Sequence, residues 1–243
     1  MWQLCSAVLA LTLAVGGCGS SGGGGGDADG GGGGGADAAT CTGDNVLYLV
    51  KGGGTYTPGT TDSRSNTSGV LAGTDPVTFE AFPYGDSNWA DVVSCVQSGL
   101  APYDIVVTDQ DPGDASHWEI VLSTSSESVG LGTGVWALSP LTCGVVPNGV
   151  AFVFTDRSTS ATLNCGVVLS DFGQLVGLER VTACDDVMDD SASCNLQDPN
   201  RGFTDQAAHC GLDAPDTCTC DRGPNDTQNS HQILLDALGS CPG

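Results

Sequence analysis

Basic residues are scarce in this sequence. Its 243 residues include 6 Lys and Arg against 29 Asp and Glu, which gives a formal net charge of −23. Lys51 is the single lysine, and the five arginines are scattered along the chain with no basic patch. Such a balance repels phosphate backbones and anionic lipid headgroups. We therefore expect no nucleic-acid partner, and the acidity itself is typical of a solvated surface that keeps a protein soluble.

The sequence also lacks an apolar run long enough to span a bilayer. Residues 4–15 form a run of 12, which suits the core of a signal peptide and falls short of the roughly 18 apolar residues of a membrane span. Residues 1–3 carry none of the positive charge usual before such a core. The apolar run therefore predicts that this protein is exported.

The apolar run ends in Val15-Gly16-Gly17-Cys18, which resembles a bacterial lipobox. In that motif small residues admit the signal peptidase, and the cysteine thiol receives a diacylglycerol anchor. We expect residues 1–18 to be a lipoprotein signal peptide with Cys18 as the lipidated residue. The protein would then be anchored by lipid to the cell envelope. Gly19, rather than aspartate, follows the cysteine, which favours the outer membrane or cell surface. The alternative is a plain secretory leader.

A change of composition separates a tether from a globular domain. Residues 19–40 are low-complexity Gly, Ser, Ala and Asp, which cannot bury enough apolar surface to repay ordering. We expect a disordered tether there and one globular domain over residues 41–243.

Cysteines are abundant in the expected domain. Of 12 in the chain, Cys5 leaves with the leader and Cys18 receives lipid, so 12 − 2 = 10 remain, an even number that fits five disulfides. Zinc ligation is the alternative, but paired C-x₂-C spacing is missing. The pairing is open. The candidates are Cys41, Cys95, Cys143, Cys165, Cys184, Cys194, Cys210, Cys218, Cys220 and Cys241.

Hydrophobic patterning predicts an α/β or α+β domain. Short apolar runs bounded by turn residues predict strands, and apolar residues at three- and four-residue spacing predict helices. The expected strands are residues 45–50, 77–82, 104–108, 118–122 and 150–154. The expected helices are residues 89–100, 161–178 and 228–238. Between the last two helices, residues 182–221 form a loop segment that disulfides must order.

The segment from Ser170 to Arg180 contains Gly177, and Met188 follows it. Together with the order of the expected elements, these residues resemble a metzincin-type zinc peptidase, in the form found as small secreted bacterial lipoproteins. In that family an edge strand precedes a long helix carrying H-E-x-x-H-x-x-G-x-x-H, then a Met-turn and a terminal helix. The resemblance covers about residues 45–239. It implies a mixed sheet, an active-site-type helix, a Met-turn at Met188, a C-terminal helix and an edge strand at residues 150–154.

The zinc ligands of that family are missing. The resemblance places the three ligand histidines on Ser170, Gln174 and Arg180, and the general-base glutamate on Asp171. A hydroxyl and a carboxamide are poor zinc ligands, and a guanidinium puts a permanent positive charge where a dication would bind. We expect no cofactor, with zinc present only if the family chemistry survives. Asp171 is a degenerate general-base position without a metal-bound water.

The remaining candidate ligands do not rebuild a metal site. No two of His117, His209 and His231 stand at ligand spacing, and we expect each at the surface or at a helix cap. Calcium could use aspartates within residues 185–190, but no twelve-residue calcium loop is present. A serine nucleophile elbow is also missing.

These expectations define a leading function and two alternatives. The leading hypothesis is a pseudopeptidase, a catalytically inactive metzincin-like module that binds an extracellular peptide or protein by strand addition. The first alternative is a divergent metallopeptidase or other hydrolase. The second is a structural envelope lipoprotein. Its main partner would be the membrane, to which the lipid anchor attaches it.

Replacing the lipobox cysteine tests the anchor. The variant Cys18→Ala should incorporate no labelled fatty acid and should release the protein into the soluble fraction, because one thiol carries the lipid. Continued incorporation of the label in this variant would show that the motif is not a lipobox.

Overall fold

The computed structural model describes residues 42–220 and 226–241. The expectations for the signal peptide, Cys18, the tether and Cys41 lie outside these residues. No helix in the described part of the chain is long and apolar enough to cross a membrane.

The described residues form a mixed α/β structure, as the patterning predicts. It has three α-helices, ten strands and two short 3₁₀ turns at Ser63–Ser65 and Glu127–Val129. The helices are α1 (Gly85–Leu100), α2 (Ala161–Leu175) and α3 (Ser230–Leu238). The strands are β1 (Val46–Val50), β2 (Gly54–Pro58), β3 (Thr67–Ser68), β4 (Val77–Phe79), β5 (Val106–Thr108), β6 (Trp118–Ser123), β7 (Ala137–Leu138), β8 (Val150–Phe154), β9 (Ala207–His209) and β10 (Thr227–Asn229).

A five-stranded mixed sheet lies at the centre, in the order β5-β1-β6-β8-β7. Its strands are parallel except β7, which runs antiparallel to β8. Every residue of β6 and β8 is buried, because both faces of the sheet are covered. Buried parallel strands read as continuous apolar runs, which is why the sequence reveals these two so clearly.

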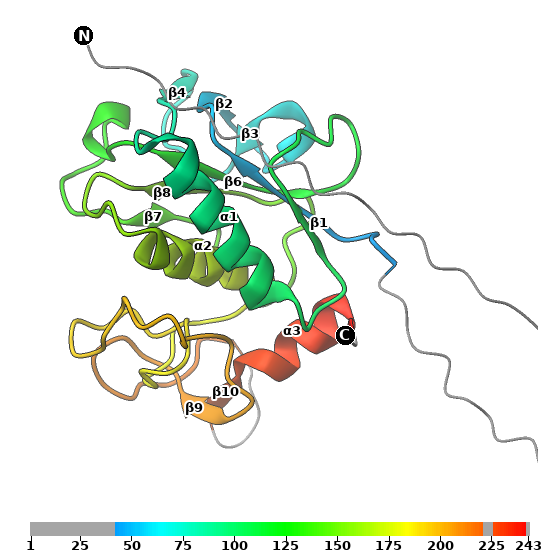
Figure 1. The fold of residues 1–243 in the computed structure, drawn as a ribbon, viewed down its shortest axis with the longest axis vertical. Helices are drawn as coiled ribbons and strands as arrows, with labels where there is room; N and C mark the ends of the chain where they lie inside the picture. The colour runs from blue at the N-terminus through cyan, green and yellow to red at the C-terminus, as the bar shows by residue number, and fades with distance from the viewer. Residues whose placement is uncertain (1–41, 221–225, 242–243) are drawn as a thin grey trace, which may run out of the picture. The chain divides into compact units, whose positions relative to one another are not determined.

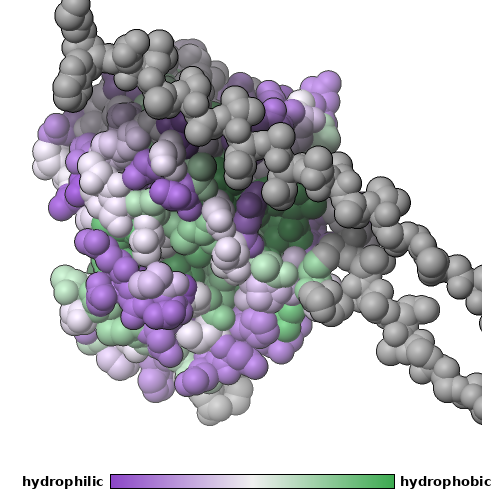
Figure 2. All heavy atoms as spheres, viewed as in Figure 1, coloured by the Kyte–Doolittle hydropathy of each residue, from purple (hydrophilic) through white to green (hydrophobic). Residues whose placement is uncertain are grey.

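Helices cover one face of this sheet. Ile120 and Leu122 of β6, with Ala151 and Val153 of β8, belong to the larger core cluster, which they share with apolar residues of all three helices. In Figure 1, α1 and α2 lie side by side over this face. A disulfide between Cys95 and Cys165 joins the two helices directly. Figure 2, drawn from the same side, shows hydrophobic surface near the middle of this face and hydrophilic surface toward its margins.

A small sheet of order β3-β2-β4 covers the other face. Phe79 of β4 stacks on Phe152 of β8 with ring centroids 4.1 Å apart, and Tyr56 of β2 packs edge-on against Phe152. The Tyr56 hydroxyl also donates a hydrogen bond to Glu119, a glutamate on β6 whose side chain is almost fully buried. One buried carboxyl therefore links the two sheets.

Disulfides order the segment after α2, as expected. They join Cys184 to Cys194, Cys210 to Cys218, and Cys143 to Cys220. Cys241 is also disulfide-bonded. Apolar packing contributes as well, since Val187, Met188 and Phe203 from this segment join the main core. Figure 1 shows the segment in yellow to orange beside α2.

The prediction that residues 150–154 form an edge strand is wrong. Residues 150–154 form β8, which lies between β6 and β7 and is fully buried. The strand at the edge is β7, which has two residues and therefore leaves too little alternation in the sequence to be recognised. The five predicted strands and three predicted helices otherwise match β1, β4, β5, β6, β8 and α1 to α3, with boundaries shifted by up to four residues.

The link between the sheets predicts a pH dependence of stability. Burial raises the pKa of Glu119 to about 7, against a smaller lowering by the Tyr56 hydrogen bond. The folded-state pKa of Glu119 exceeds its unfolded-state pKa of about 4.5. Neutral Glu119 therefore stabilises the fold fully below about pH 4.5, and this stabilisation is lost as the pH rises through about 7. Glu119→Gln should remove this loss, which amounts to about 3 kcal/mol.

The measurement is chemical unfolding at pH 4.5 and pH 8, followed by circular dichroism. Glu127→Gln, the same substitution at an exposed glutamate, controls for the loss of one negative charge. The free energy of unfolding should change more between the two pH values in the unmodified protein than in Glu119→Gln. Equal changes in the two proteins would contradict the raised pKa of Glu119.

Candidate functional site

A cavity of about 310 Å³ lies between the segment that leads into β7, helix α2 and the chain that follows α2. Helix α2 contributes one face, because its lining residues recur at three- and four-residue spacing. The lining residues of α2 are Leu163, Gly166, Val167, Ser170, Asp171 and Gln174. The opposite wall is formed by residues 134–137, and the rest by Arg180, Val187, Asp189, Asp190, Leu196 and Arg201.

The cavity brings together the four positions that the resemblance singles out. Ser170, Asp171 and Gln174 line it from α2, and Arg180 lines it from the chain beyond the helix. Gly177 makes this return possible, since it has a φ of +94° and a Cβ there would lie 2.9 Å from the backbone of Gly144. Only glycine fits such a turn without strain.

Met188 lies beneath the same helix. It is fully buried, and a Cβ placed on Gly173 of α2 would come within 2.5 Å of its sulfur atom. The absence of a side chain at Gly173 therefore lets the helix approach the Met188 segment closely. This segment carries Asp189 and Asp190 into the cavity.

An ion pair lies across the site. The Arg180 Nε is 2.7 Å from the Asp190 Oδ2, and the two side chains are 48% and 37% exposed. The other oxygen of Asp190, Oδ1, is buried and has no hydrogen-bond partner. Burial raises the pKa of Asp190, and the attraction of Arg180 only partly offsets it.

Asp171 is a deeply buried acid of the site. Its residue is 4% exposed, and none of the hydrogen bonds among the described residues involves its carboxyl oxygens. Burial raises its pKa well above the usual range, Arg180 lowers it, and Asp190 raises it further. Asp171 therefore favours its neutral form, which can donate as well as accept a hydrogen bond.

Arg201 forms part of the wall, and sequence reasoning missed it. Its guanidinium donates to the backbone carbonyls of Cys184, Asp186 and Asp189. These partners carry no formal charge, and burial lowers the pKa of Arg201. Trp136, also missed, lines the opposite wall, with the guanidinium of Arg157 4.9 Å from its ring centre. Arg201 stands alone in a loop segment and Trp136 directly precedes a two-residue strand, so neither belongs to a hydrophobic pattern that the sequence could reveal.

These side chains do not fit a zinc ion. Ser170 and Gln174 offer a hydroxyl and a carboxamide, and the Arg180 guanidinium puts a positive charge in the cavity and pairs with Asp190, one of the three carboxyls that line it. The three histidines lie in separate elements. The expectation for His117 is wrong, because it is buried with its Nδ1 2.8 Å from the Ala115 carbonyl. His209 is exposed on β9, and His231 bonds Tyr103 in the first turn of α3.

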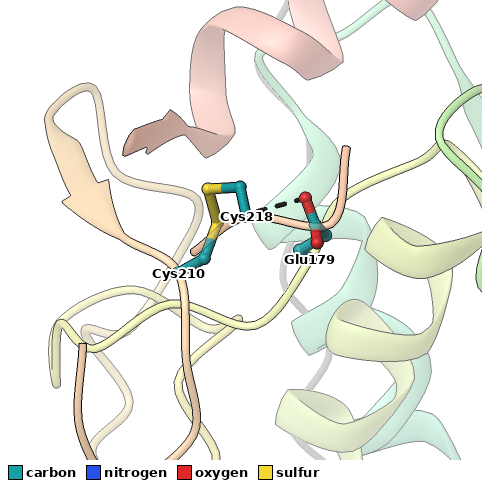
Figure 3. Close-up of side chains that lie close together, drawn as sticks. All are labelled: Glu179, Cys210 and Cys218. Carbon is teal, nitrogen blue, oxygen red and sulfur yellow. Dashed lines mark hydrogen bonds between the residues drawn. A yellow bond between two sulfur atoms is a disulfide. The ribbon is translucent and has the colours of Figure 1, made fainter. Parts of the chain in front are cut away.

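Two other groups of acids and cysteines are structural. Glu179 lies against Cys210 and Cys218, but those cysteines form a disulfide and offer no thiolate (Figure 3). The Glu179 carboxylate accepts hydrogen bonds from the backbone N–H groups of Thr219 and Cys220. Asp189 likewise neighbours the disulfide of Cys184 and Cys194. Disulfide sulfur has no charge to attract a cation, so neither group is a metal centre.

Comparison with known proteins gives no family. No family model matches the chain, and no curated protein matches it.

Two glycines of α2 provide a test of the packing beneath the site. Gly173→Ala should lower the free energy of unfolding by about 1–2 kcal/mol, because the added methyl group meets Met188, Leu178 and Phe203. Gly166→Ala should instead raise it by up to about 1 kcal/mol, since its nearest neighbour is 4.0 Å away and alanine favours a helix. Urea unfolding of both variants measures the difference. Equal effects would show that α2 does not pack closely at Gly173.

Proposed function

We propose that this protein is a peptide-binding module of the cell envelope: a metzincin-like scaffold without peptidase activity, exported and anchored by lipid through Cys18. The observation that carries the proposal is the cavity beside the open edge of β7. The disulfides described above support an oxidising compartment, where such bonds persist.

Several features of the fold support the metzincin-like scaffold. A mixed sheet has its single antiparallel strand, β7, at the edge that borders the cavity. Helix α2 follows β8, ends in the turn at Gly177, and packs on the buried Met188 before α3 completes the domain. The resemblance implies the same order of mixed sheet, helix, turn, buried methionine and terminal helix, although it places the edge strand at residues 150–154.

The hydrogen-bonding pattern of β7 supports peptide binding by strand addition. The Trp136 carbonyl accepts a hydrogen bond from the Phe154 N–H of β8, and Ala137 lies opposite Val153. Pairs alternate in an antiparallel ladder, so the N–H and C=O groups of Ala137 point away from β8. No described strand lies on that side. An extended peptide could therefore pair with Ala137 while its side chains reach the cavity.

The chemistry of the cavity supports binding rather than hydrolysis. Metal-dependent hydrolysis needs an ion that lowers the pKa of a bound water. Here the corresponding space holds Arg180, a guanidinium that stays protonated and cannot activate water in that way. The walls formed by Val135, Val167 and Leu196 add apolar contact area for a ligand.

Proline at position 137 tests strand addition. The full chain, purified in detergent and immobilised, would be exposed to a synthetic library of random heptapeptides blocked at both ends. Ala137→Pro should reduce peptide retention at least tenfold, because it removes the outward N–H and leaves the ladder to β8 intact. The matched control Ala137→Ser keeps that N–H and should stay within twofold.

Circular dichroism establishes that both variants fold. The retained peptides should be recovered uncleaved, and the preparation should hold less than one zinc per chain. Undiminished retention by Ala137→Pro would reject strand addition, and stoichiometric zinc with cleaved peptides would reject the pseudopeptidase.

A further inference from the structure

Positive charge is concentrated around the cavity. The described residues carry five lysine and arginine side chains, Lys51, Arg64, Arg157, Arg180 and Arg201. Lys51 and Arg64 pair with surface aspartates away from the cavity. The other three surround it: Arg180 and Arg201 line it, and Arg157 covers the Trp136 ring that lines it. In a chain with a net charge of −23, this is a strongly uneven distribution.

Arg180 has hydrogen-bond donors to spare. Its closest contact with Asp190 is made by Nε, and neither Nη group is hydrogen-bonded to a described residue. The ion pair fixes the direction of the guanidinium, so little side-chain freedom remains to be lost when a ligand binds. A carboxylate matches the two parallel N–H groups of a guanidinium edge better than any other common group in peptides.

Three aspartates, Asp171, Asp189 and Asp190, also line the cavity and face its two arginines. The hydrogen bonds of Arg201 go to backbone carbonyls, which have no formal charge. Asp171 favours its neutral form because burial raises its pKa. Asp190 is therefore the acid that pairs directly with a cavity arginine. The apolar walls of the cavity strengthen the attraction between a free guanidinium edge and an anionic group inside it.

We propose that the cavity binds a carboxylate presented by an extended peptide, which accepts two hydrogen bonds from the Nη groups of Arg180. The carboxylate belongs to a glutamate or aspartate side chain or to the peptide C-terminus. Asp190 acts as a positioning residue for Arg180, because its Oδ2 pairs with the Arg180 Nε. A volume of about 310 Å³, roughly ten water molecules, admits a side chain of this size. This inference rests on the proposed peptide-binding function.

A library of defined composition tests the charge preference. The immobilised full chain would be exposed to heptapeptides, blocked at both ends, in which each position in turn carries glutamate, glutamine or lysine. Glutamate should be enriched at least tenfold over glutamine at one position. A second library, with glutamine throughout and a free C-terminal carboxylate, distinguishes a terminal carboxylate from a side chain.

Substitution of Arg180 identifies the group responsible. Arg180→Gln should abolish the preference for glutamate, and Arg180→Lys should restore part of it, because lysine keeps the charge but loses the planar fork. Arg64→Gln is the matched control, since Arg64 pairs with Asp62 in an exposed turn. Asp190→Asn should weaken the preference without removing it, and it serves as a second probe if Arg180→Gln fails to fold.

The outcomes separate this inference from the function on which it rests. Equal retention of glutamate and glutamine peptides, still sensitive to Ala137→Pro, would overturn the carboxylate site alone. A preference for lysine, or a glutamate preference that survives Arg180→Gln, would also overturn it. Retention of no peptide from either library would overturn both proposals.

Discussion

The close contact between α2 and the Met188 segment is the constraint on which the site depends. It is possible because Gly173 has no side chain at the point where Met188, Leu178 and Phe203 converge. The segment held there carries Asp189 and Asp190 into the cavity, and the turn at Gly177 brings Arg180 back beside them. The disulfide between Cys95 and Cys165 joins the same helix to α1. Helix α2 is thus held on two sides, by α1 and by the Met188 segment, and it forms one wall of the cavity.

The sequence could predict the elements that are long or continuously buried. Helices α1 and α2 show apolar residues at helical spacing, and β6 and β8 read as unbroken apolar runs because both faces of the sheet are covered. The edge strand could not be found this way. Two residues, Ala137 and Leu138, carry no alternation, and β8 becomes the last strand of the sheet when this short partner goes unrecognised. That sheet is built from short strands whose few apolar residues, such as Tyr56 and Phe79, lie far apart in sequence.

The site was predictable to the extent that helical periodicity fixes geometry. Ser170, Asp171 and Gln174 must share a face of any helix that contains them, and the structure places all three on the cavity. Their environment could not be predicted. The neutral form that burial favours for Asp171, and the carbonyl partners of Arg201, depend on segments that disulfides and tertiary packing bring together. Arg201 lies 21 positions beyond Arg180 in a stretch without periodicity, so nothing local relates the two.

An arginine in place of a metal ligand changes what such a cavity can do. A metal ion polarises a carbonyl and ionises a bound water, and it can leave when its ligands are protonated. A guanidinium is held by the chain, stays charged at any physiological pH and accepts no lone pair, so it offers attraction and direction without Lewis acidity. The pairing of its Nε with Asp190 offsets the cost of partly burying that charge. The two Nη groups remain without a hydrogen-bond partner among the described residues. A cavity built in this way has the means to hold an anionic group and lacks the means to hydrolyse a peptide bond through metal-bound water, which is why we propose binding rather than catalysis for it.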